Sequence, residues 1–113
     1  MCDDRQLSEI MTCVTKYSEQ EFGDNLKDVV LFGSYARGDF NDESDVDIMI
    51  LVDRSQMELK SLQSAFSSLS TDIDLAYDVV SSLHLQDYRL FQDWKEALPF
   101  YREVVCDGVS AYV

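Results

Sequence analysis

Residues 29–52 of this chain read VVLFGSYARGDFNDESDVDIMILV, and this stretch decides the fold. Its first four residues are apolar, and a short continuous apolar run is typical of a strand buried on both faces, so a strand is predicted over residues 27–32. After Gly33-Ser34 and a polar loop, Asp and apolar residues alternate and then give way to a wholly apolar run. This pattern predicts a second strand over residues 45–52.

Helices are expected on both sides of this stretch. Apolar residues recur at helical spacing over residues 4–21, and Asp3 or Asp4 can cap the start of that helix. Ser55 and Glu58 form a capping box, which opens a second helix. One face of the second helix carries the apolar residues Leu59, Leu62, Phe66 and Leu69.

The last third of the chain is expected to hold two strands and a helical segment. Aspartates alternate with apolar residues over residues 71–78, which predicts a strand. A helical pattern runs from about residue 83 and is interrupted near Pro99, and a short strand is expected over residues 109–113. These elements predict an α/β fold of the α+β type, a small mixed β-sheet flanked by helices, in one domain over residues 1–113.

The composition supports a folded domain and narrows its partners. The chain has 113 residues, of which 46% are hydrophobic, and six Phe, six Tyr and one Trp provide material for a core. It carries 22 acidic and 9 basic residues, so its formal net charge is −13 and phosphate backbones repel it. A long nucleic acid is therefore not expected as a partner.

The sequence also bears on location and redox state. No apolar stretch approaches the ~20 residues of a membrane span, and the acidic N-terminus lacks an apolar signal core. We therefore expect a cytoplasmic protein without membrane contact. Cys2, Cys13 and Cys106 lie far apart without a Cys-x-x-Cys pair, which predicts reduced thiols.

The connection after the first strand has the chemistry of an anion site. A buried strand that ends in Gly33-Ser34 and opens a short helix leaves backbone N–H groups free to bind an anion. Gly33 has no Cβ and lets the backbone approach a ligand closely, and the Ser34 hydroxyl can donate to a phosphate oxygen.

Two aspartates on the second strand suggest a metal site. Asp45 and Asp47 share a face of the strand, with Cα atoms roughly 6–7 Å apart. Such carboxylates repel each other unless a cation lies between them, and hard oxygen ligands favour Mg²⁺ or Mn²⁺. Asp74, on the next predicted strand, is the expected third ligand. Three carboxylates can hold two ions ~3.5–4 Å apart, the arrangement used in nucleotidyl transfer.

Other motifs fit these residues poorly. Gly33 and Gly38 have the spacing of a P-loop, but an acidic and an aromatic residue follow where Lys and Ser/Thr are required. An EF-hand loop that began at Asp39 would lack its central glycine and its final glutamate. The simplest alternative is that the acidic residues of this stretch form a solvated loop.

The spacing Gly33-Ser34, ten residues, Asp45-x-Asp47 resembles the signature of the DNA polymerase beta-like nucleotidyltransferases. The fuller run Gly-Ser-x-Ala-Arg-Gly, followed by Ser-Asp-x-Asp, resembles the minimal nucleotidyltransferase (MNT) family of bacteria and archaea. Residues 107–112 are similar to the usual ending of that family. The resemblance covers most of the chain and implies the polymerase beta-like palm fold.

The resemblance implies a nucleotide site in the connection after the first strand. Gly33 and Ser34 would hold the triphosphate of ATP, the expected substrate. Arg37 would either contact phosphate or form a salt bridge with the acidic loop.

The resemblance also implies a metal and catalytic set. Asp45 and Asp47 would ligate Mg²⁺, with two ions expected and Mn²⁺ as an alternative metal. Asp74 would complete the catalytic set as third carboxylate, and Asp72, on the same face, is the alternative for that position.

Finally, the resemblance implies a reaction and a partner. Members of this family pair with a small helical HEPN protein, often an RNase toxin, and transfer AMP from ATP to one of its tyrosines. The chain is thus expected to be an antitoxin of this kind, alone or as an oligomer, and its acidity suits a basic partner. Two alternatives stay open: transfer to the hydroxyl of a small molecule, and a non-catalytic binding module.

Residues outside the motif are expected to be structural. His84 is assigned to a helix start or to the surface. The C-terminal helices are expected to pack on the sheet through Tyr88, Phe91, Trp94 and Leu98.

Overall fold

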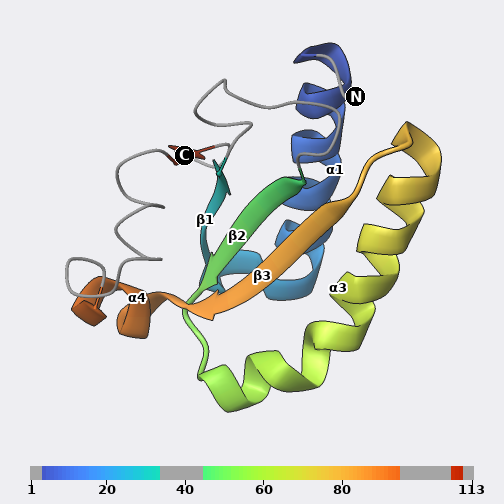
Figure 1. Ribbon diagram of the computed structural model, residues 1–113. Coiled ribbons are helices and arrows are strands. Elements are labelled where there is room, and N and C mark those ends of the chain that lie inside the picture. Colours follow the sequence, from blue (N-terminus) through green and yellow to red (C-terminus); the bar gives the residue numbers. More distant parts are fainter. Residues whose placement is uncertain (1–3, 34–44, 95–107, 111–113) are drawn as a thin grey trace.

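The computed structural model describes residues 4–33, 45–94 and 108–110, which form a mixed sheet with helices around it (Figure 1). In chain order the elements are α1 (Asp4–Phe22), the 3₁₀ turn η1 (Gly23–Asn25), β1 (Leu26–Phe32), β2 (Val46–Val52), α3 (Gln56–Tyr77), β3 (Ser81–Asp87), α4 (Tyr88–Trp94) and β4 (Val109–Ser110). The predicted fold class, an α+β domain with a small mixed sheet, is confirmed.

The order of the strands brings three strand ends together at one edge of the sheet. The described strands lie in the order β3-β2-β1-β4. β1 is antiparallel to β2, with Phe32 opposite Asp47, and β2 is parallel to β3, with Asp47 opposite Ser82. The end of β1 therefore lies beside the starts of β2 and β3, at the upper edge of the sheet in Figure 1.

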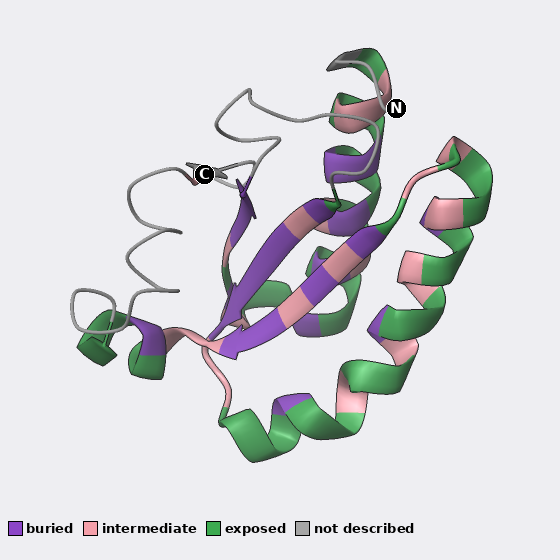
Figure 2. Ribbon diagram, viewed as in Figure 1, coloured by how far each residue is buried: buried purple, intermediate pink, exposed green. Residues whose placement is uncertain are grey.

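One face of the sheet forms the main core. Figure 2 shows that the strands are largely buried, whereas α1 and α3 expose their outer sides. On this face Phe66 of α3 is fully buried and meets Tyr17 edge-to-face and Phe22 in a stacked arrangement, with centroids 5.1 and 5.8 Å apart. Aromatic pairs of this geometry add to the stability that burial alone provides. The sheet residues of this cluster include Val29, Leu31, Val46, Ile48, Ile50, Val52, Leu83 and Leu85.

The opposite face is covered differently. Its smaller cluster joins Val30, Phe32, Met49 and Leu51 of the sheet to Phe91 of α4, with Tyr88 packed against it. Packing of Tyr88 and Phe91 on the sheet is thus confirmed, whereas Trp94 stays about half exposed. Asp47 belongs to this face, because side chains alternate along β2.

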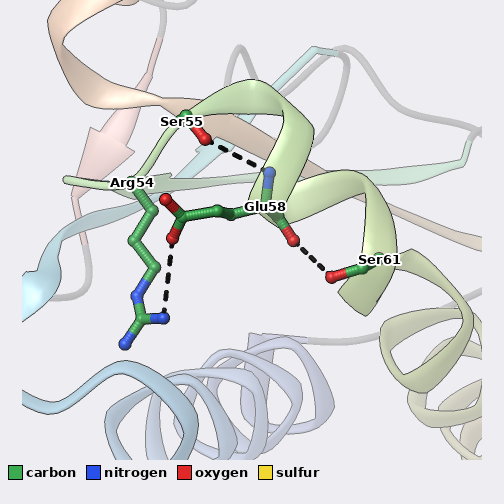
Figure 3. Close-up of polar contacts among 4 residues, drawn as sticks. All are labelled: Arg54, Ser55, Glu58 and Ser61. Carbon is green, nitrogen blue, oxygen red and sulfur yellow. Dashed lines mark hydrogen bonds and ion pairs between the residues drawn. The ribbon is translucent and has the colours of Figure 1, made fainter.

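The start of α3 is capped as the sequence predicts. Ser55 is the N-cap, and its hydroxyl accepts a hydrogen bond from the Glu58 N–H at 3.3 Å (Figure 3). Arg54 places its guanidinium 3.8 Å from the Glu58 carboxylate and over the ring of Phe22, 5.8 Å from the centroid. Ser61 donates to the Glu58 carbonyl at 2.7 Å.

The predicted strand over residues 71–78 is wrong, because α3 continues to Tyr77. Ile73 lies seven residues after Phe66, and both side chains are buried against the sheet. This helical period carries the helix through a segment whose aspartates alternate. The helix ends at Asp78, which adopts the left-handed conformation with φ 53° that Asp tolerates.

The third strand is instead β3, and the helix expected from residue 83 begins only at Tyr88. β3 is held from its free side by α3. Gln56 and Gln63 donate to the carbonyls of Leu85 and Leu83 at 3.4 and 3.5 Å. These bonds satisfy backbone groups at an edge that has no further strand among the described residues.

The remaining predictions agree with the structure where it describes them. The first helix, the first two strands and a closing strand are confirmed as α1, β1, β2 and β4. The short helix after Gly33, the packing of Leu98 and the break near Pro99 lie outside the described residues. In the described part of the chain, no helix has the length and apolarity needed to cross a membrane.

Candidate functional site

The candidate site lies where β1 ends and where β2 and β3 begin. Phe32, Asp47 and Ser82 form one row across the three strands. The N–H of Val46 donates to the carbonyl of Val80 at 2.8 Å, which joins the approaches to β2 and β3. The row of residues at this edge is therefore fixed by backbone hydrogen bonds.

Gly33 meets Asp47 at this edge. It follows the last residue of β1, is buried and has φ +78°, a conformation that side-chain-bearing residues rarely adopt. A Cβ on Gly33 would lie 2.7 Å from Oδ2 of Asp47, closer than van der Waals contact permits. The position therefore requires glycine for two reasons, the backbone conformation and the proximity of the carboxylate.

Asp45 and Asp47 supply the acidic groups of the edge. Asp45 is exposed directly before β2, and Asp47 is half-buried at its second position. Alternation along β2 places the side chain of Asp47 on the face opposite α1 and α3. Two carboxylates fit Mg²⁺, which is bound through one or two carboxylates with the rest of its shell from water and substrate phosphates. Among the described residues, no three His, Cys, Asp or Glu side chains gather as a metal site.

Asp74 does not lie on the third strand. It is part of α3, where its Oδ1 accepts the backbone N–H of Ser81 at 2.7 Å and its carbonyl accepts the N–H of Val79 at 3.3 Å. Asp74 therefore ties the end of α3 to the start of β3. Asp72, the alternative third carboxylate, is exposed on α3. The structure brings neither residue into a group with Asp45 and Asp47.

His84 lies at the site, in contrast to its predicted place at a helix start or on the surface. It is half-buried in β3 on the face of Asp47, and its ring centroid is 5.6 Å from that of Phe32. Burial lowers the pKa of His84 below its usual 6.5, while the charge of Asp47 acts in the opposite direction. The alternation of Leu83 and Leu85 around this histidine was the sequence signal that could have placed it on a strand.

Ser34 and Arg37 lie outside the described residues. Their contacts with phosphate, and the choice of Arg37 between phosphate and a salt bridge, stay predictions.

Comparison with known proteins shows the family of the chain. The family described as "Nucleotidyltransferase domain" matches residues 14–101. Two proteins of Methanocaldococcus jannaschii that carry the name protein adenylyltransferase are similar in sequence. One is 46% identical over 59 residues, which make up 52% of this chain and only 58% of that protein. The other is 33% identical over 94 residues, or 83% of this chain and 86% of that protein.

Solved structures share the fold. A crystal structure of a toxin–antitoxin complex with AMP-PNP superposes with a TM-score of 0.55 and 20% identity, over 90% of this chain and 72% of that chain. A mutant of the toxin–antitoxin complex MntA–HpeT gives a TM-score of 0.52 at 19% identity, over 88% of this chain and 70% of that chain.

The proximity of Gly33 to Asp47 predicts that a methyl group added at position 33 destabilises the fold. Gly33→Ala is expected to lower the free energy of unfolding by about 1–3 kcal/mol, measured in urea. Gly23→Ala is the matched control, because Gly23 also has positive φ, at +55°, but a Cβ there would meet nothing within 4 Å. In an Asp47→Ala background the two glycine substitutions should have equal effects. Equal effects in the native background would contradict the contact.

The hydrogen bond of Asp74 predicts a structural role for this carboxylate. Asp74→Ala is expected to lower the free energy of unfolding by about 1–2 kcal/mol, because the Ser81 N–H loses its acceptor. Asp74→Asn keeps an oxygen acceptor and should recover most of this loss. Calorimetry with Mn²⁺ and AMP-PNP should give unchanged binding for Asp74→Asn. A folded Asp74→Asn variant that no longer binds them would restore Asp74 as the third ligand.

Proposed function

The chain belongs to the nucleotidyltransferase domain family, and from this premise we propose that it is a Mg²⁺-dependent protein adenylyltransferase. It transfers AMP from ATP to a tyrosine of a HEPN-family toxin and thereby acts as the antitoxin of that toxin. Asp45 and Asp47 hold the metal, and Gly33 with Ser34 holds the triphosphate.

One observation carries this proposal: the buried, positive-φ Gly33 lies against the carboxylate of Asp47. Because Gly33 has no Cβ, a triphosphate can approach the backbone next to a carboxylate that can bind its metal. The match of the family over residues 14–101 includes both residues.

The names and titles of similar proteins support the choice of substrate and partner. The two M. jannaschii relatives are named protein adenylyltransferases. The two structural neighbours are toxin–antitoxin complexes, one of them with AMP-PNP, an analogue of ATP. The net charge of −13 also favours a basic protein partner, because opposite charges speed the encounter of two proteins.

The proposed reaction is a direct transfer. The tyrosine oxygen forms a bond to the α-phosphorus of ATP, the bond from that phosphorus to the bridging oxygen breaks, and pyrophosphate leaves. The tyrosine proton passes to a base at the site. Bound Mg²⁺ would neutralise the triphosphate and the charge that develops on the leaving group. Asp45 and Asp47 would hold this metal at the edge of the sheet, and the backbone at Gly33 would leave room for phosphate.

Labelled ATP tests this proposal. The chain is incubated with Mg²⁺, ATP labelled at the α-phosphate and a HEPN-family protein from the same genome. Label is expected on a tyrosine of that protein. Asp45→Asn or Asp47→Asn should lower the rate by more than about 100-fold, because each removes a charge that holds the metal.

Asp72→Asn is the matched control, since Asp72 is an exposed aspartate on α3, and this variant should retain the full rate. Label on the partner at the full rate with Asp45→Asn and Asp47→Asn combined would contradict the proposed site. Label found only on a small alcohol would contradict the proposed acceptor. A chain that neutralises its partner without binding Mg²⁺ and ATP would be a binding module.

A further inference from the structure

We propose that His84 positions the carboxylate of Asp47 for the metal, and that β3 contributes this imidazole where a third carboxylate was expected. The inference rests on the proposed function, because it concerns the same metal and nucleotide site. It assigns a role to a residue that the sequence pattern did not associate with the site.

The register of the sheet places His84 next to the site. β2 and β3 run parallel, with Asp47 opposite Ser82 and Met49 opposite His84. Side chains alternate along each strand, so Asp47, Met49, Ser82 and His84 all lie on the same face. His84 is thus two residues further along its strand than the direct neighbour of Asp47, within reach of a long side chain.

The ring of His84 packs against the ring of Phe32, the residue that pairs with Asp47. Phe32 pairs with Asp47 across β1 and β2, and the His84 ring packs against the Phe32 ring at 5.6 Å with an angle of 51° between the planes. The imidazole therefore leans across β2 toward the row that contains Asp47. Asp47 lies close enough for its charge to act on His84.

β3 itself is fixed, so His84 has a defined place. Asp74 accepts the Ser81 N–H at the start of the strand, and β3 pairs with β2 along its whole length, from Ser81 to Asp87.

A carboxylate that holds a metal works best when its orientation is fixed by a second group. An imidazole N–H directed at Asp47 can fix the carboxylate in this way. Asp45 is exposed, whereas Asp47 is half-buried beside Gly33 and His84. His84 would therefore act through Asp47, as a positioning residue.

The test distinguishes the effect of the His84 N–H donor from the effect of the volume of its ring. His84→Phe keeps a ring on Phe32 but removes the N–H, whereas His84→Asn and His84→Gln keep an N–H donor. The probe is the Mn²⁺ complex of AMP-PNP, and its affinity for the full chain is measured by calorimetry. We expect His84→Phe to weaken binding by about 10–100-fold, and at least one of the amide variants to bind within about threefold of the native chain.

Two controls separate positioning from a general disturbance of β3. Gln63→Ala removes a bond to the carbonyl of Leu83 without touching the face of Asp47, and should leave the affinity unchanged. Thermal unfolding of each variant shows whether it folds. If His84→Phe does not fold, the amide variants are compared with His84→Leu, which also lacks an N–H donor and should bind as weakly as predicted for Phe.

The outcomes also distinguish this inference from the proposed function. If the native chain binds no Mn²⁺–AMP-PNP, or if Asp47→Asn binds it as the native chain does, the proposed function fails together with the inference. If the native chain binds Mn²⁺–AMP-PNP and Asp47→Asn does not, the affinities of the His84 variants test the role of His84. Native affinity in folded His84→Phe, or an equal loss in the Phe and both amide variants, would overturn the role of His84 alone.

Discussion

The antiparallel pairing of β1 with β2 is the constraint on which the site depends. It places the last residues of β1 beside the first residues of β2, and so brings Gly33 against the carboxylate of Asp47. A shift of this register by one residue would turn Asp47 toward α1 and α3 and move apolar side chains of β2 out of the core. The burial of that core therefore also fixes the geometry of the acidic edge.

One face of the sheet forms most of the apolar core, and the other face carries the candidate site. The face under α1 and α3 holds the larger cluster of buried side chains, including Phe66 with Tyr17 and Phe22, and accounts for most of the apolar packing. The opposite face holds the smaller cluster and, at one edge, Asp47 and His84. Polar groups at a sheet edge are tolerated because stability comes from the other face. Under the proposed function, the high negative charge of the chain is compatible with a triphosphate ligand, since a metal held by Asp45 and Asp47 would lower the charge at this edge.

Sequence reasoning was accurate where the pattern is local. The run of apolar residues before Gly33 and the alternation after Asp45 are strand signals that need no knowledge of distant contacts, and both strands are confirmed. The alternating aspartates before Asp78 are a local strand signal too, yet the segment is helical. Ile73 continues the buried face that begins at Leu59, and this long-range packing overrides the alternation.

The wrong strand over residues 71–78 also displaced the predicted third strand, so His84 was not predicted to lie on β3. A strand predicted before Asp78 leaves the short run around Leu83 and Leu85 to the helical pattern that follows it. Its partner β2 is far away in sequence, and β3 owes its strand conformation to that parallel pairing and to the glutamines of α3. Consequently, Asp74 was placed on a strand, whereas it lies on α3 and its carboxylate accepts the N–H of Ser81. Its role as a metal ligand stays a prediction.

The most direct test of the account is to locate the metal. Crystals of the chain grown with Mn²⁺ and AMP-PNP would show manganese by its anomalous scattering. The account predicts a peak between the carboxylates of Asp45 and Asp47, at oxygen distances of about 2.0–2.2 Å, with the phosphates next to the backbone of Gly33. A nucleotide bound with its metal away from these two aspartates, or phosphates bound away from Gly33, would contradict it.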